Sequence, residues 1–127
     1  MKLFAHTECW KFKERHPEDF KSFGCGPGGV GDRLVPDTMY CLNVSDACRI
    51  HDWYYRFWPG GEESDRKMAD NILLNNLLRI VRAKSRFKVT RWLRERRCYT
   101  YYRMVRLCGG PAFHDERNDE SNFRSVV

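Results

Sequence analysis

Two neighbouring stretches of the chain carry apolar residues at the spacing of an amphipathic helix. The first stripe also includes His51, and its apolar members are Val44, Ala47, Cys48, Tyr54, Tyr55 and Trp58. The second begins near Ser64 and continues through Met68, Ala69, Ile72, Leu73, Leu77, Ile80 and Val81. A Pro-Gly-Gly sequence at residues 59–61 separates them. The pattern therefore predicts two helices joined by a short turn, with Asn43 or Ser45 as the N-cap of the first.

The remaining segments differ from these two stripes. Residues 7–20 predict a short helix that Pro17 should end or kink. Residues 23–41 hold five glycines and two prolines, which excludes a regular helix or a central strand and predicts an ordered loop or a linker. Residues 87–107 predict a third long helix, which ends before the Gly-Gly-Pro at 109–111. We therefore expect one all-α domain over residues 1–108, followed by a polar, mobile tail over residues 109–127.

The short turn between the two stripes makes the two helices antiparallel neighbours, so residues equally far from the turn should face each other. His51 lies seven residues before Trp58, and Asp65 lies seven residues after it. At about 1.5 Å of rise per residue, each is roughly 10 Å from the turn. We therefore expect the imidazole of His51 to meet the carboxylate of Asp65, with the hydroxyl of Tyr55 bonded to the same acid. A histidine oriented in this way can take a proton from water, which is general-base hydrolysis.

A second acid, Asp52, lies about 100° around the helix from His51 and can face a different partner. The Gly-rich segment offers main-chain carbonyl oxygens, and such oxygens together with one carboxylate and waters suit Ca²⁺. Cys48 precedes Asp52 by one helical turn, so a disulfide between Cys25 and Cys48, if formed, would fasten the loop to the helix. Each feature alone is more often structural, but their joint occurrence at compatible spacing indicates a hydrolytic site.

The charge of the chain and its third predicted helix indicate an acidic partner. The formal net charge is +6, and eleven Lys or Arg lie between Arg79 and Arg106, interspersed with aromatic residues. This composition suits docking on an anionic phospholipid bilayer or micelle, for which the candidate interface residues are Arg91, Trp92 and Arg94. Nucleic acid is the alternative partner, because phosphate contacts and base stacking use the same side chains. A solvated helix face that covers an aromatic core is the structural alternative.

Six cysteines suit an oxidising compartment, yet the first sixteen residues lack the apolar run of a secretory signal. We expect synthesis in the cytoplasm, with virion association or non-classical export. No segment approaches the roughly 20 apolar residues of a transmembrane helix. The remaining cysteines have no CxxC spacing, which argues against a zinc knuckle and leaves their pairing open; they are Cys9, Cys41, Cys98 and Cys108.

Three motifs together resemble the calcium-dependent phospholipase A2 superfamily: CGPGG at residues 25–29, ACRIHDWYY at 47–55 and SDRKMAD at 64–70. The Gly-Pro-Gly form of the loop is also similar to the phospholipase segment of parvovirus capsid proteins. The resemblance covers about residues 23–76. It implies a calcium loop followed by two long antiparallel helices, to which this chain adds a basic C-terminal helix. The departures are Ala47 in place of a cysteine, Gly24 in place of a tyrosine, and a longer loop before Val44.

The resemblance implies calcium-dependent hydrolysis of the sn-2 ester of glycerophospholipids, by a water molecule that His51 activates. Asp65 would orient His51, and Tyr55 would support Asp65. Ca²⁺ would be held by Asp52 and the carbonyl oxygens of Gly24, Gly26 and Gly28.

Two other functions remain open at this stage. One is an HD-type metal phosphohydrolase, in which His51 and Asp52 share a transition metal with a recruited His6 or His16. That function leaves the Gly-rich segment and Asp65 without a role. The other is a catalytically inactive basic module that keeps the scaffold and binds membranes or nucleic acid.

Overall fold

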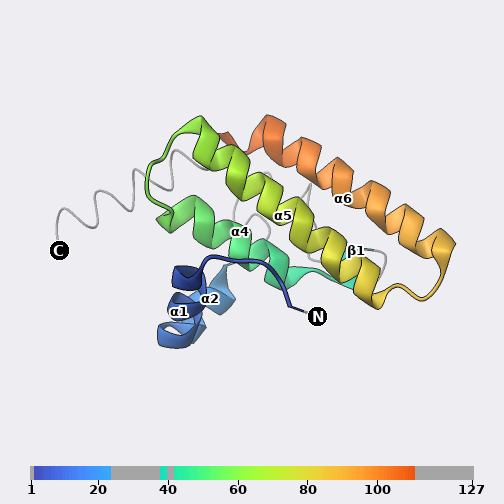
Figure 1. Ribbon diagram of the computed structural model, residues 1–127, viewed down its shortest axis with the longest axis horizontal. Coiled ribbons are helices and arrows are strands. Elements are labelled where there is room, and N and C mark those ends of the chain that lie inside the picture. Colours follow the sequence, from blue (N-terminus) through green and yellow to red (C-terminus); the bar gives the residue numbers. More distant parts are fainter. Residues whose placement is uncertain (1, 24–37, 40–41, 111–127) are drawn as a thin grey trace.

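The computed structural model describes residues 2–23, 38–39 and 42–110 and is mainly helical (Figure 1). In chain order the elements are α1 (Thr7–Arg15), α2 (Pro17–Ser22), β1 (Thr38–Met39), β2 (Leu42–Asn43), α4 (Ser45–Phe57), α5 (Glu63–Lys84) and α6 (Lys88–Cys108). β1 and β2 form a short antiparallel pair. The helical class expected from the sequence is confirmed. The calcium loop of the predicted architecture falls within residues 24–37, outside the described residues.

The helix predicted over residues 7–20 is two helices that meet at Pro17. His16 ends α1 with φ of −133° and ψ of 63°, and Pro17 takes the first position of α2. A proline is favoured there because the first N–H groups of a helix have no partner within the helix. The two short helices pack on α4 through aromatic rings, with the Phe12 centroid 5.7 Å from that of Phe23 and 5.0 Å from that of Phe57.

α4 and α5 are joined by a connection that spans Trp58 to Glu62. Gly60 and Gly61 have φ of 113° and 74°, values that glycine adopts without steric strain. A side chain at position 60 would also collide with the carboxylate of Asp65. The turn predicted from Pro-Gly-Gly is therefore present, and it requires glycine.

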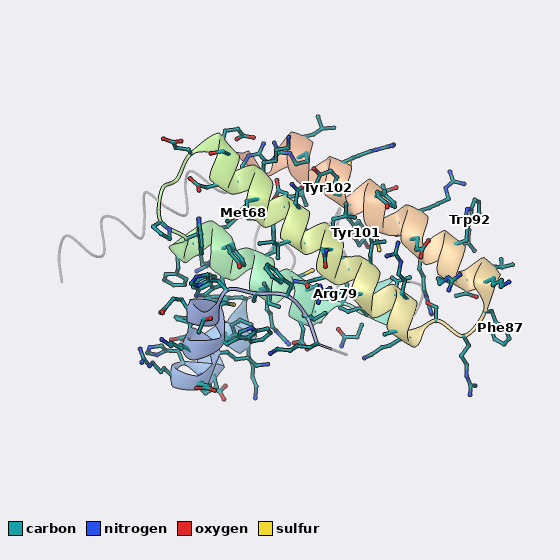
Figure 2. The ribbon with its side chains drawn as sticks, in the orientation of Figure 1. Met68, Arg79, Phe87, Trp92, Tyr101 and Tyr102 are labelled. Atoms are coloured by element: carbon teal, nitrogen blue, oxygen red, sulfur yellow. The ribbon has the colours of Figure 1, made fainter. Side chains whose placement is uncertain are left out.

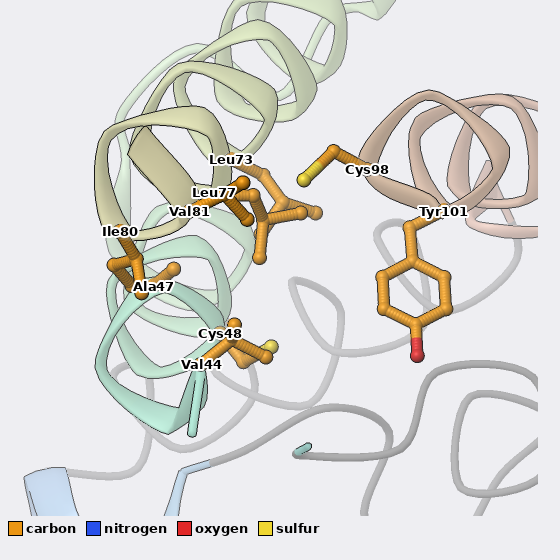
Figure 3. Packing of buried hydrophobic residues seen from close by; sticks show 9 residues of the cluster. All are labelled: Val44, Ala47, Cys48, Leu73, Leu77, Ile80, Val81, Cys98 and Tyr101. Carbon is orange, nitrogen blue, oxygen red and sulfur yellow. The ribbon is translucent and has the colours of Figure 1, made fainter. Parts of the chain in front are cut away.

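α5 lies between α4 and α6 (Figure 1). The core that these three helices share consists of Val44, Ala47, Cys48, Leu73, Leu77, Ile80, Val81, Cys98 and Tyr101 (Figure 3). Seven of these nine residues belong to the two apolar stripes recognised in the sequence, where the helical spacing had predicted them. A second cluster joins α1 and α2 to α4 and to the first turns of α5, and it includes Phe20, Ile50, Trp53 and Ile72.

α6 matches the third helix predicted over residues 87–107. It packs along α5 in the antiparallel sense, so its last turn returns to the beginning of α5 (Figure 1). Cys98 and Tyr101 are its buried residues, and the hydroxyl of Tyr102 donates a hydrogen bond of 2.8 Å to Oδ1 of Asn71. None of the described helices combines the length and the apolar composition needed to cross a membrane.

Candidate active site

A histidine and a buried aspartate meet between α4 and α5. Nε2 of His51 lies 2.8 Å from Oδ1 of Asp70, and the hydroxyl of Tyr55 donates a hydrogen bond of 2.6 Å to the same oxygen. The carboxylate of Asp70 is fully buried, whereas 14% of the His51 side chain is exposed. Because Nε2 faces the acid, the other ring nitrogen, Nδ1, is available to a water molecule when Nε2 carries the proton. The described residues therefore contain an imidazole, an acid and a tyrosine in the arrangement that general-base chemistry requires.

The prediction that Asp65 faces His51 is wrong, because Asp70 occupies that place. Oδ2 of Asp65 instead accepts a hydrogen bond of 3.0 Å from the main-chain N–H of Glu62, and the Glu62 side chain accepts in return, which is a capping box. Asp65 therefore stabilises the start of α5.

Asp65 was predicted in place of Asp70 because the residues were counted from Trp58, which lies in the connection between the two helices. Residues 58–62 belong to the connection and add no helical rise, so distances must be measured from the helix ends. His51 lies six residues before Phe57, and Asp70 lies seven residues after Glu63. The sequence does contain a signal for Asp70, because this residue lies three positions before Leu73 and so on the buried stripe.

The second oxygen of Asp70 is held by α5 and α6. Oδ2 accepts a hydrogen bond of 2.7 Å from Nη1 of Arg106, and Nη1 of Arg66 lies 3.5 Å from it. Burial opposes the ionisation of Asp70, but hydrogen bonds from His51, Tyr55 and Arg106 and the charge of His51 outweigh it and hold its pKa below the usual range. Burial and the negative charge of Asp70 raise the pKa of Tyr55, which therefore stays protonated and can donate.

Glu63 completes the charge network beside Asp70. Its carboxylate accepts hydrogen bonds of 2.7 and 2.8 Å from Arg66 and one of 2.7 Å from Arg106. These bonds lower the pKa of Glu63 to about 2. Two guanidinium groups thus lie between two carboxylates, so the charges at this end of α5 and α6 balance.

Glu63→Gln is expected to weaken the dependence of folding stability on acid pH. A carboxyl group with a lowered folded pKa stabilises the fold fully above its usual value of 4.5, and this stabilisation is lost as the pH falls towards 2. The free energy of unfolding of the wild type should therefore fall more steeply over this range than that of Glu63→Gln. Urea unfolding followed by circular dichroism measures both slopes, with Glu14→Gln as an exposed control. Parallel curves for wild type and Glu63→Gln would contradict the interpretation.

Asp52 follows His51 on α4 and is the acid predicted to bind calcium. It is 6% exposed, and its Oδ1 lies 3.6 Å from Nε of Arg56. A carboxylate is a suitable hard ligand for Ca²⁺, although the Arg56 guanidinium would have to give way to the cation. Within residues 2–23, 38–39 and 42–110, no three His, Cys, Asp or Glu side chains gather as a metal site.

The other predicted calcium ligands, the carbonyl oxygens of Gly24, Gly26 and Gly28, lie outside the described residues. Cys25 lies there too. Cys48 is disulfide-bonded, and the described cysteines Cys9 and Cys98 are free thiols. The pairing of Cys48 with Cys25 therefore stays a prediction. Burial raises the pKa of both free thiols to about 12, so neither is a reactive thiolate near neutral pH.

The histidines that a phosphohydrolase would recruit have other roles. Nδ1 of His6 accepts a hydrogen bond of 3.2 Å from the main-chain N–H of Glu8 and so caps α1. Nδ1 of His16 lies 4.0 Å from the exposed carboxylate of Asp19. Neither contact brings a second imidazole to His51.

The predicted interface residues lie in the first half of α6. Arg91 is exposed, and the guanidinium of Arg96 lies 4.9 Å from the centroid of the exposed Trp92 ring. Arg94 differs from the other two predicted residues, because it is half-buried and donates a hydrogen bond of 2.9 Å to Oγ of Ser85. It therefore ties α6 to the α5–α6 connection.

Two more exposed apolar side chains, which the sequence analysis did not assign to the interface, stand beside Trp92. Phe87 is 71% exposed and Val89 is 70% exposed. Together with Lys88, Arg91, Trp92, Leu93 and Arg96 they form what we call the α6 surface. Phe87 and Trp92 lie at the end of the helix pair opposite Met68, which is two residues from Asp70 (Figure 2).

Comparisons with known proteins give no relative for this chain. No family model matches it, and neither a curated protein nor a solved structure does. The likeness to phospholipases A2 therefore rests on the motifs and on the chemistry of the residues described above.

Proposed function

We propose that the protein is a calcium-dependent phospholipase A2-type hydrolase that cleaves the sn-2 ester of glycerophospholipids. The observation that carries this proposal is the hydrogen bond between His51 and Asp70, with Tyr55 on the same carboxylate oxygen. The acid comes from the helix that follows the His-Asp sequence, as the resemblance requires of the orienting residue. Asp70, in place of Asp65, takes that role.

The described residues suffice for the proton transfers of ester hydrolysis. Nε2 of His51 donates to Asp70, and Nδ1 removes a proton from water as the water oxygen attacks the ester carbonyl carbon. Asp70, kept ionised by its donors, stabilises the imidazolium that forms. His51 then passes the proton to the glycerol oxygen as the ester C–O bond breaks, which yields a fatty acid and a lysophospholipid.

Asp52 would be the carboxylate ligand of Ca²⁺ in this mechanism, with the carbonyl oxygens of Gly24, Gly26 and Gly28 as further ligands. Bound Ca²⁺ would polarise the ester carbonyl and stabilise the negative charge on its oxygen. The position of Asp52 next to His51 supports this assignment, because it sets the predicted metal ligand and the base on adjacent residues of one helix.

The α6 surface supports a lipid substrate. Exposed Phe87 and Trp92 can enter the headgroup region, and the surrounding Lys and Arg side chains attract anionic lipids. Each basic residue near an anionic membrane contributes about 1 kcal/mol of attraction. A nucleic-acid partner would use the same charges, and the experiment below separates the two.

The deciding experiment measures fatty acid released from vesicles of phosphatidylcholine and phosphatidylglycerol, with Ca²⁺ or with a chelator. We expect release from the sn-2 position in Ca²⁺ and release at the level of protein-free vesicles in chelator. Equal release under both conditions would contradict the calcium mechanism. Binding to vesicles or to duplex DNA without any release would favour the inactive basic module. Cleavage of a phosphate ester with Mn²⁺ but not Ca²⁺ would favour the HD-type phosphohydrolase.

A further inference from the structure

The last turn of α6 reaches the candidate site, although α6 lies outside every motif that indicated hydrolysis. Arg106 uses both ends of its guanidinium fork there. Nη1 donates to Oδ2 of Asp70 at 2.7 Å, and Nη2 donates to Oε1 of Glu63 at 2.7 Å. Two charge-assisted bonds of this length orient a planar group in two directions at once. Arg106 is therefore held between the orienting acid and the first turn of α5.

The two oxygens of Asp70 have separate tasks. Oδ1 receives His51 and Tyr55 from α4, and Oδ2 receives Arg106 from α6. A carboxylate that accepts hydrogen bonds on one oxygen only can rotate about the bond between Cβ and Cγ. With donors on both oxygens and full burial, the plane of the carboxylate is fixed, and the lone pair aimed at His51 is fixed with it.

A different residue holds the main chain of α6 in place. Arg66 donates from Nη1 to the carbonyl oxygen of Val105 at 3.3 Å and from Nη2 to that of Arg106 at 3.1 Å. Carbonyls in the last turn of a helix lack partners within the helix, so Arg66 satisfies two of them. The docking of α6 on α5 therefore has an anchor besides the Arg106 side chain, whose contacts are with the two carboxylates.

Gly109 gives the α6 terminus its second contact with the site. A Cβ atom at this position would lie 2.5 Å from the main-chain oxygen of Val105 and 2.8 Å from the hydroxyl oxygen of Tyr55. This is closer than real Cβ contacts, so the residue after α6 must be small for Tyr55 to keep its bond to Asp70. Arg106 thus contacts Asp70, and Gly109 lies close to Tyr55, so the end of α6 borders both groups.

We propose that Arg106 is a positioning residue of the hydrolytic site, which fixes the Asp70 carboxylate so that its other oxygen orients His51. This inference rests on the proposed function for its catalytic consequence. The charged or titratable groups that face Asp70 are His51 and Tyr55 from α4, Arg66 from α5 and Arg106 from α6, with Glu63 behind the two arginines. Loss of Arg106 removes the 2.7 Å bond from Oδ2, where Nη1 of Arg66 remains at 3.5 Å, and leaves Tyr55 and His51 on Oδ1.

The test compares Arg106→Gln with Arg103→Gln. Arg103 lies one turn earlier on α6 and is exposed, so its replacement removes the same charge without touching Asp70. With phosphatidylcholine micelles, which carry no net charge, we expect Arg106→Gln to lower kcat by about 10- to 100-fold with KM within about twofold of the wild type. The acid limb of its kcat profile should move to higher pH. Arg106→Lys should recover part of kcat, and Arg103→Gln should match the wild type.

A second measurement does not depend on activity. The ¹³C resonance of the Asp70 carboxyl carbon should titrate at higher pH in Arg106→Gln than in the wild type or in Arg103→Gln, because a donor to the ionised form is gone. This titration shows whether Arg106 donates to the Asp70 carboxylate, and kcat shows whether that bond serves catalysis.

The outcomes separate the two proposals. Equal kcat and equal Asp70 titration in Arg106→Gln and Arg103→Gln would overturn the role of Arg106. A wild type without esterase activity would overturn the proposed function, and the Asp70 titration would then still show whether Arg106 holds the carboxylate. A shifted titration with unchanged kcat in an active enzyme would show that Arg106 binds Asp70 without serving catalysis, which also overturns the inference.

Discussion

Asp70→Asn should lower kcat for ester hydrolysis by about 10³- to 10⁴-fold, whereas Asp65→Asn should leave it within about twofold of the wild type. An amide at position 70 has no negative charge to stabilise an imidazolium, and with its oxygen towards His51 and Tyr55 its NH2 group would face the donor Nη1 of Arg106. At position 65 asparagine keeps the acceptor for the N–H of Glu62, so only a part of the cap is lost. Initial rates of fatty acid release from phosphatidylcholine–phosphatidylglycerol vesicles measure both variants.

Folding must be controlled in this comparison, because the two aspartates also contribute to stability. Asp70→Asn leaves Arg106 with Glu63 as its remaining carboxylate, and we expect a lower melting temperature. Asp65→Asn removes a favourable charge from the first turn of α5, which costs about 0.3–1 kcal/mol. Rates are therefore compared at a temperature where circular dichroism shows both variants folded. Loss of activity in Asp65→Asn alone, or equal losses in both, would contradict the assignment.

The helices were predictable because each depends on local signals. The two apolar stripes located α4 and α5, Pro17 located the boundary between α1 and α2, and Gly-Gly-Pro located the end of α6. Helical periodicity indicates which face of a segment is buried, and about two turns of sequence are enough to recognise that face. The predicted N-cap of α4, Asn43 or Ser45, is wrong: the capping residue is Val44, which separates Ser45 from Asn43, whose side chain accepts from the N–H of Ser45.

The pairing of side chains between helices was less predictable, because it depends on the connection. An error of a few residues in where α5 begins moves every facing residue by more than one turn, at about 1.5 Å per residue. The connection has five residues, and Asp70 lies five residues after Asp65. Leaving the connection out of the count was therefore enough to predict Asp65 in place of Asp70. The contact between His51 and Tyr55 was predictable because both lie on one helix, where the spacing of four residues brings their side chains together.

The arginines of the site could not be inferred from spacing at all. Arg106 and Asp70 are separated by 36 residues, and Arg66 binds carbonyl oxygens about 40 residues away. Such contacts depend on which part of α6 lies beside which part of α5. The periodicity within either helix does not determine this alignment. In the sequence Arg106 is one of eleven basic residues in a region that suits an acidic partner, and nothing distinguishes it from its exposed neighbours.

The two ends of α6 therefore serve different purposes in the proposed enzyme. Its first half carries exposed Phe87 and Trp92 among basic residues, and its last turn holds Asp70 through Arg106. One rigid helix of 21 residues thus connects the lipid-facing surface to the acid that orients the base. Because α6 packs along α5 over most of its length, a structural change at either end of α6 must be accommodated in its packing against α5.

His51→Gln should reduce hydrolysis by about 10⁵- to 10⁶-fold while changing the free energy of unfolding by less than about 1 kcal/mol. The glutamine amide has no basic nitrogen, so it cannot take the proton from water. It can still donate a hydrogen bond to Asp70, and glutamine is close to histidine in size, so the surroundings keep their packing. Vesicle hydrolysis and urea unfolding of the same preparation measure the two quantities.

The double variant His51→Gln/Asp70→Asn shows whether Asp70 works through His51. If the acid acts only by orienting and stabilising the imidazole, its removal costs no further activity once the imidazole is gone, and the double variant should be as active as His51→Gln alone. A further loss of the full Asp70→Asn factor would mean that Asp70 acts on the substrate directly. Residual calcium-dependent hydrolysis in His51→Gln at more than about 1% of the wild-type rate would mean that another group is the base. Non-additivity is the expected result, because Asp70 is fully buried and its side-chain contacts within the described residues are with His51, Tyr55 and the two arginines.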